Sequence, residues 1–85
     1  MMRLSETVEM MESTDYKERF KAEYFQLKIR VNALKNMLEK WDKGELDFTP
    51  ACPREIFDDQ IQYMMNYMTV LADRAHYEHI DLSEN

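Results

Sequence analysis

The 85-residue sequence contains one glycine, two prolines and one cysteine. So few turn-forming residues leave room for few turns, which indicates a mostly helical chain. Cys52 has no second cysteine to pair with, so a disulfide within the chain and a zinc cluster of several thiolates are excluded. No run of about 18 apolar residues occurs, so no transmembrane helix is expected. The first residues, MMRLSETVEMMES, carry three glutamates and lack the apolar run of a signal peptide, so we expect a cytoplasmic protein.

The composition nevertheless favours a folded chain, since 45% of the residues are apolar and 33% are charged. A single domain of this size buries little of its own surface, and such domains usually need a metal, a disulfide or a partner chain. The formal net charge is −6. Because non-specific binding to DNA or RNA depends on neutralising many phosphates, this charge argues against it. A small anionic ligand held by a few arginines remains compatible with it.

A first long helix is predicted from 15 to 43. Asp15 and Glu18 have the spacing of a capping box, and Gly44 stands where a left-handed helix stop is favoured. Between them, apolar residues recur at alternating steps of four and three, which is the spacing of a helix-packing seam. The seam consists of Phe20, Tyr24, Leu27, Val31, Leu34, Leu38 and Trp41.

A second long helix is predicted from 53 to 79, since proline at position 53 suits a helix start. Its seam consists of Phe57, Ile61, Met64, Met68, Leu71 and Ala75. Because the linker is short, the two helices should form an antiparallel hairpin over 15–79, with Leu46 and Phe48 plugging its end. Residues 1–14 form a leader that is either a short amphipathic helix or disordered, and 80–85 form an irregular or loosely packed tail.

The second helix also carries a second apolar stripe, which a two-helix hairpin cannot bury. It consists of Ile56, Tyr63, Tyr67, Val70 and Tyr77, interrupted by Gln60 and Arg74. A long apolar stripe is unfavourable in water. We therefore predict an all-α fold, a long helical hairpin with a short leader helix, packed as a homo-oligomeric bundle. The alternative is a monomeric three-helix bundle in which the leader covers this stripe.

Enzymatic and metal chemistry find little support in the sequence. Asp73, His76 and His79 share one helix end, but two histidines without a third fixed ligand are a weak metal signal. The dipole of the second helix favours a thiolate at Cys52, but both histidines lie at the far end of that helix. No phosphate loop, serine elbow or HExxH motif occurs. We expect no enzyme, no metal and no cofactor.

Anion binding is the more specific possibility. In CPREI, Arg54 is combined with the free N–H groups of a helix start, where phosphates bind well. The same residues are equally consistent with Arg54 pairing and Glu55 capping the helix. Arg74 interrupts the tyrosine-rich stripe, where it is placed either to reach an anion between protomers or to pair with a carboxylate. Tyr67 and Tyr77 are suited to stacking on a base or to oligomer contacts.

Residues 52–75, CPREIFDDQIQYMMNYMTVLADRA, resemble the helical-hairpin domain of phage anti-defence sponges, the anti-CBASS and Thoeris anti-defence proteins. The pattern LxFTPxCPxxxxxxQxxxM is also similar to small phage proteins, including those of crAss-like phages. Arg54 and Glu55 match the Arg-Glu that opens the second helix of those sponges, whereas Gln60 and Ile61 stand where a threonine is expected.

The resemblance implies a small homo-oligomer without catalysis. It would sequester a cyclic oligonucleotide or a related nucleotide immune signal in pockets between protomers, in the host cytoplasm. Arg54, Glu55, Arg74, Tyr67 and Tyr77 are then the candidate ligand contacts, and the ligand itself stays open. The alternative function is a phage helical module that docks its spare stripe on a host protein and inhibits or regulates it.

Overall fold

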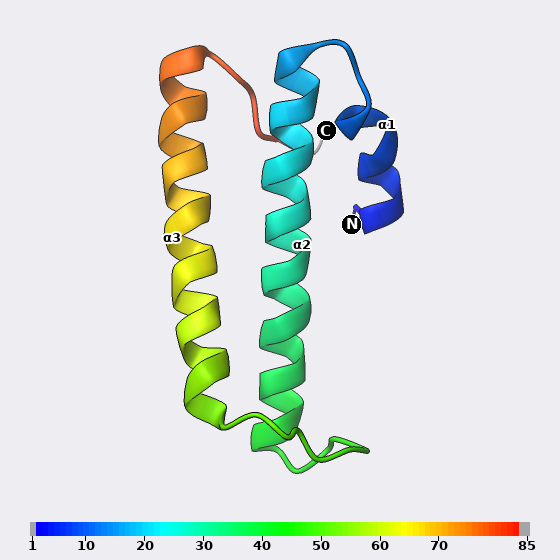
Figure 1. Ribbon diagram of the computed structural model, residues 1–85, viewed down its shortest axis with the longest axis vertical. Helices are drawn as coiled ribbons and strands as arrows, with labels where there is room; N and C mark the ends of the chain where they lie inside the picture. The colour runs from blue at the N-terminus through cyan, green and yellow to red at the C-terminus, as the bar shows by residue number, and fades with distance from the viewer. Residues whose placement is uncertain (1, 84–85) are drawn as a thin grey trace.

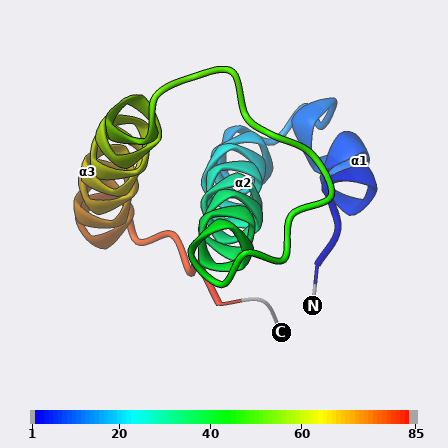
Figure 2. The ribbon, with the colours of Figure 1, turned by 90° about the horizontal axis from the view of Figure 1, so that it is seen from below.

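The computed structural model describes residues 2–83, and all regular structure in this range is helical. A 3-10 helix, η1 (Leu4–Thr7), leads into a short helix, α1 (Val8–Met11). Two long helices follow, α2 (Tyr16–Asp42) and α3 (Arg54–Glu78). α2 and α3 run antiparallel side by side, and α1 lies on the opposite side of α2 from α3 (Figures 1 and 2). The predicted all-α hairpin with a short leader helix is confirmed.

The ends of α2 are set by local signals. Asp15 is the N-cap residue, and its carboxylate accepts a hydrogen bond of 2.9 Å from the Lys17 N–H. At the other end Gly44 has a φ of 70°, and the following residue, Glu45, donates its N–H to the Lys40 carbonyl at 2.8 Å. This left-handed turn satisfies a carbonyl that the helix end would leave free. The predicted helix stop at Gly44 is therefore confirmed.

The ends of α3 follow the same logic. Pro53 is extended (φ −60°, ψ 146°) and is the N-cap, one position before the helix. His79 ends the helix in the left-handed conformation with a φ of 58°. The next residue, Ile80, donates its N–H to the Ala75 carbonyl at 2.9 Å and is itself buried. The tail is thus irregular, but Ile80 anchors it in the core instead of leaving it loose.

A buried cluster lies at the open end of the hairpin, where α2 begins and α3 ends, and Val31 and Leu38 are buried further along α2. Phe20, Leu71, Ala75 and Ile80 form a buried cluster, against which Tyr24, Leu27 and Leu82 pack. At the loop end, the Trp41 and Phe57 rings meet edge to face, with centroids 5.9 Å apart. Phe48 is 54% exposed, so its predicted role as a plug is wrong. Trp41 and Phe57, both predicted seam residues, close this end because they face each other directly.

The leader packs on a second face of α2. Ala22 and Phe25, which lie off the predicted seam, are buried there. Thr7 is fully buried, donates its hydroxyl to the Leu4 carbonyl at 2.7 Å and accepts from the Gln26 side chain at 3.0 Å. The leader makes its contacts with α2. The alternative in which the leader covers the second stripe of α3 is therefore wrong.

Candidate functional site

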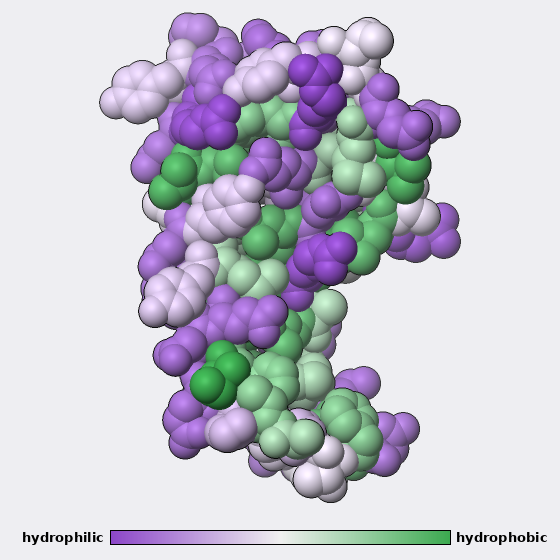
Figure 3. All heavy atoms as spheres, in the orientation of Figure 1, coloured by the Kyte–Doolittle hydropathy of each residue, from purple (hydrophilic) through white to green (hydrophobic). Residues whose placement is uncertain are grey.

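The second stripe of α3 is open to solvent. Tyr63, Tyr67 and Tyr77 are 71%, 45% and 82% exposed, and Ile56 and Val70 are also more than half exposed. We call these five residues, with Gln60 and Arg74 between them, the α3 outer row. Figure 3 shows pale and green side chains along the left margin of the molecule, with purple, hydrophilic side chains between them. The apolar and aromatic members of the row therefore remain largely uncovered in the single hairpin.

Arg74 crosses from this row to the start of α2. Its Nη2 donates to the Tyr16 hydroxyl at 2.6 Å, and its Nε donates to Glu78 at 3.3 Å. The Tyr16 hydroxyl in turn donates to Glu78 at 2.8 Å. The Arg74 guanidinium also lies over the Phe20 ring, 4.8 Å from its centroid. Arg74 thus closes the open end of the hairpin, and its side chain keeps 46% of its surface exposed.

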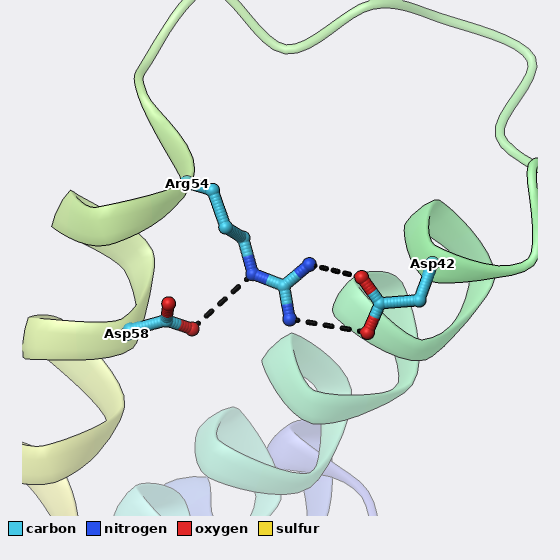
Figure 4. Close-up of polar contacts among 3 residues, drawn as sticks. All are labelled: Asp42, Arg54 and Asp58. Atoms are coloured by element: carbon cyan, nitrogen blue, oxygen red, sulfur yellow. Dashed lines mark hydrogen bonds and ion pairs between the residues drawn. The ribbon is translucent and has the colours of Figure 1, made fainter.

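Arg54 occupies the equivalent place at the loop end (Figure 4). Its two Nη atoms donate to the two carboxylate oxygens of Asp42, and its Nε donates to Asp58 at 3.2 Å. The guanidinium lies 5.5 Å from the Trp41 ring centroid. A fork that meets both carboxylate oxygens is the geometry arginine favours. The structure therefore shows Arg54 in its pairing role, joining α3 to the end of α2.

These contacts change the protonation of the groups involved. The hydrogen bonds from Arg54 lower the pKa of the Asp42 carboxyl, and the same bonds raise the pKa of the Arg54 guanidinium. At the other end, the hydrogen bond to Glu78 raises the pKa of the Tyr16 hydroxyl. Asp42 is therefore ionised and Tyr16 neutral at neutral pH.

The predicted site residues do not converge within one chain. Arg54 and Arg74 are twenty positions apart on α3, which corresponds to about 30 Å of helix. Tyr67 and Tyr77 lie on the outer row with Arg74, whereas Arg54 points to α2. Glu55 is exposed in the first turn of α3 and makes no ion pair among residues 2–83. The structure thus groups Arg74, Tyr67 and Tyr77 on one face and separates Arg54 from them.

Two hollows of the surface lie mainly along α2. One, of about 500 Å³, is lined by α2 and the hairpin loop, including Ala33, Met37 and Phe48. A neighbouring hollow of about 420 Å³ shares Ala33 and Met37 and reaches Leu4 of the leader. They form the notch between leader and loop on the right of Figure 3. Gln60 of the outer row borders the second hollow, whereas none of the predicted ligand contacts lines either of the two.

The other candidate chemistry stays dispersed. Within residues 2–83, no three His, Cys, Asp or Glu side chains gather in a way that could hold a metal ion. His76 stacks edge-on against Tyr77, with ring centroids 5.5 Å apart, and His79 is the C-cap of α3. Cys52 is half-buried in the linker. No described helix has the length and apolar content needed to cross a bilayer.

Sequence reasoning missed the two partners that hold the arginines across the hairpin. Asp42 is the last residue of α2 and Tyr16 the first, and each meets an arginine at the facing end of α3. Asp42 and Tyr16 are distant in sequence from Arg54 and Arg74, so sequence spacing does not predict these pairs. The antiparallel arrangement does, because a hairpin brings the start of each helix to the end of the other.

The fold and the exposed row define a small helical-hairpin protein built around two arginine clusters. A model of the Sequestin family matches residues 14–77, from the cap of α2 almost to the end of α3. Since this match covers most of the chain, the protein belongs to the Sequestin family. The family name denotes a sequestering role, which is consistent with binding without catalysis. No curated protein and no solved structure matches the chain.

Proposed function

We propose that this Sequestin is a phage anti-defence protein that binds a small nucleotide signal in the host cytoplasm and withholds it from its effector without catalysis. The ligand class is a cyclic oligonucleotide or a related phosphate-containing nucleotide. The observation that carries the proposal is the face of α3 on which half-exposed Arg74 stands among exposed tyrosines.

The chemistry of this face suits a nucleotide. A guanidinium fork binds phosphate oxygens in pairs, and tyrosine rings stack on nucleobases. Arg74 is already oriented by Tyr16 and Glu78, which reduces the side-chain freedom lost on binding. With a net charge of −6, the protein repels long polyanions. A compact ligand with few phosphates, which few cations can hold, fits the surface better than DNA or RNA.

Arg54 and Glu55 are the second pair of candidate contacts, by their match to the Arg-Glu of the phage sponges. Phosphate would have to replace Asp58 or Asp42 as the partner of Arg54, since both carboxylates now occupy it. In this proposal Arg54 therefore contributes less to binding than Arg74, Tyr67 and Tyr77.

Ligand capture tests the proposal directly. Purified protein at micromolar concentration is incubated with a panel of cyclic di- and trinucleotides and cyclic ADP-ribose derivatives, and then separated from free ligand by filtration. Heat denaturation should release the captured ligand with unchanged mass, which distinguishes sequestration from turnover. Arg74→Ala and Tyr77→Ala should reduce capture at least tenfold, while Arg30→Ala, the matched control at an exposed arginine of α2, should not. If every ligand stays free, the proposal fails.

The second candidate function is a protein-binding module, favoured by the length of the outer row. Exposed tyrosine and aliphatic side chains from Ile56 to Tyr77 suit a partner helix. This function predicts a hairpin that stays monomeric and binds no nucleotide, while a host protein covers the row.

A further inference from the structure

We propose that Arg74 binds phosphate through the free edge of its guanidinium, and that Glu78 beside it makes this site select a phosphodiester over a terminal phosphate. The inference rests on the proposed function and deepens it, because it says which kind of phosphate the nucleotide signal carries. Glu78 is then a specificity-determining residue and Tyr16 a positioning residue. Neither is among the ligand contacts predicted from the sequence.

Arg74 keeps free hydrogen-bond donors although it is already paired. A guanidinium has five N–H donors, one on Nε and two on each Nη. Nε donates to Glu78 at 3.3 Å, and Nη2 donates to the Tyr16 hydroxyl at 2.6 Å. Nη1 makes no hydrogen bond among residues 2–83. The edge formed by Nη1 and the second hydrogen of Nη2 is therefore free, and its two parallel N–H groups match two oxygens of one phosphate.

Arg54, the other arginine of α3, shows the contrast. Its two Nη atoms meet both carboxylate oxygens of Asp42, and its Nε donates to Asp58. All three nitrogens of Arg54 are thus occupied, and its side chain is 32% exposed, against 46% for Arg74. A phosphate can join Arg74 without displacing a partner, whereas at Arg54 it must first break an ion pair.

Three contacts fix the position of the Arg74 guanidinium. It lies over the ring of Phe20, which is 3% exposed, at 4.8 Å from the ring centroid. The Tyr16 hydroxyl accepts from Arg74 and donates to Glu78 at 2.8 Å, which closes a ring of three hydrogen bonds. Because one Glu78 oxygen accepts from Tyr16 and the other from Arg74, the negative charge of Glu78 is held beside the guanidinium.

This fixed charge determines which phosphate is accepted. Arg74 and Glu78 cancel each other's charge, so the choice between two ligands depends on the charge that each ligand brings. A phosphodiester carries a single negative charge, whereas a terminal phosphate carries about −1.5 to −2 at pH 7. The additional charge lies close to Glu78, in a protein whose net charge is already −6. Near a protein surface, such a like-charge contact weakens binding about tenfold.

Tyr77 places an aromatic ring next to this phosphate position. It follows Arg74 by three positions, which makes the two side chains neighbours on the helix surface, and it is 82% exposed. A base that is joined to the bound phosphate through one sugar can therefore stack on Tyr77. This geometry makes 3′,5′-cyclic AMP and 5′-AMP suitable probes. They share base and sugar, and their phosphate is a diester in the first and a terminal phosphate in the second.

Titration of each probe, followed by the side-chain NMR signals of Arg74, tests the inference. Arg74→Ala identifies these signals by their loss. The native protein should bind cyclic AMP about tenfold more tightly than AMP. In Glu78→Gln, which keeps an acceptor oxygen but no charge, AMP should bind more tightly and the preference should fall to about threefold or less. Glu45→Gln, the matched control in the linker at the opposite end of the hairpin, should keep the native preference.

Tyr16→Phe tests the positioning role separately from the charge. The change removes the hydroxyl that holds Arg74 and Glu78 together, and it leaves both charges in place. Both probes should therefore bind about threefold more weakly or worse, because Arg74 loses orientation, while the preference for cyclic AMP remains. Unchanged affinities for both probes would show that Tyr16 does not position Arg74.

Equal affinities of the native protein for the two probes, tighter binding of AMP, or an unchanged preference in Glu78→Gln would overturn the inference. So would Arg74 signals that neither probe shifts at about 10 mM, where even millimolar binding is detected. Capture of cyclic di- and trinucleotides is a separate measurement. Capture together with an unchanged preference in Glu78→Gln rejects the role of Glu78 alone. A preference at Arg74 without capture rejects the proposed function and leaves the phosphate selection standing.

Discussion

Leu71→Ala tests whether the open end carries the stability of the hairpin. Leu71 is 1% exposed and packs in the cluster with Phe20, Ala75 and Ile80. Truncating a fully buried leucine costs about 3 kcal/mol of unfolding free energy, through lost transfer energy and the cavity left behind. An 85-residue domain has a total stability of roughly 4–13 kcal/mol. The variant therefore loses between a quarter and most of that stability.

Thermal unfolding followed by circular dichroism measures this loss. For a domain of this size, each kcal/mol shifts Tm by about 4–8 °C, so Leu71→Ala should lower Tm by roughly 12–24 °C. Met65→Ala, at an exposed position of the same helix, should change Tm by no more than a few degrees. Equal shifts for the two variants would refute a core centred on Leu71. Both variants should be compared at one protein concentration, because any self-association would also raise Tm.

Three further predictions concern the ends of the helices and the leader. Arg54→Ala should lower Tm by less than Leu71→Ala does and should leave the helical content unchanged, because Arg54 joins two helix ends at the surface. Loss of the helical circular-dichroism signal would instead show that the contacts of Arg54 with Asp42 and Asp58 are essential to the fold. Arg54 lowers the folded pKa of Asp42 below its ordinary 3.8, so the stability from this pair is fully present above pH 3.8 and is lost as the pH falls through the folded pKa. An acid titration of Tm should therefore show a loss below pH 3.8 that Asp42→Asn abolishes. Thr7→Val removes the hydrogen bond from Gln26, so hydrogen exchange of the leader should accelerate while that of α3 is unchanged; equal protection in both proteins would show that apolar contacts alone hold the leader.

The helix ends were predictable because each has a local chemical signal. The carboxylate of Asp15, the freedom of Gly44 to adopt positive φ and the fixed φ of Pro53 act on their immediate neighbours. The seams were predictable because side-chain spacing alone decides which face of a helix is apolar. Where a position carried no such signal, as with Phe48 in the linker, the prediction was wrong.

The arrangement around the hairpin was less accessible. The leader shows apolar residues at helical spacing, and the sequence does not say which helix receives them. The leader packs on α2, where the Gln26 side chain donates hydrogen bonds to Thr7 and Met11. The apolar stripe interrupted by Arg74 was predictable from side-chain spacing, but the pairing of both arginines depends on tertiary register.

The buried residues of α3, Leu71 and Ala75, both lie near its end, so the two halves of this helix should differ in how readily they open. Local opening costs least where few apolar groups are lost to water. Amide exchange should therefore be fastest in the linker and the first turns of α3 and slowest around Leu71 and Ala75. Any chain or ligand that covers the row from Ile56 to Val70 would slow exchange most in the half that the hairpin stabilises least. Amide hydrogen exchange would therefore report binding to this face as slower local opening of α3, in addition to the amount of ligand or partner bound.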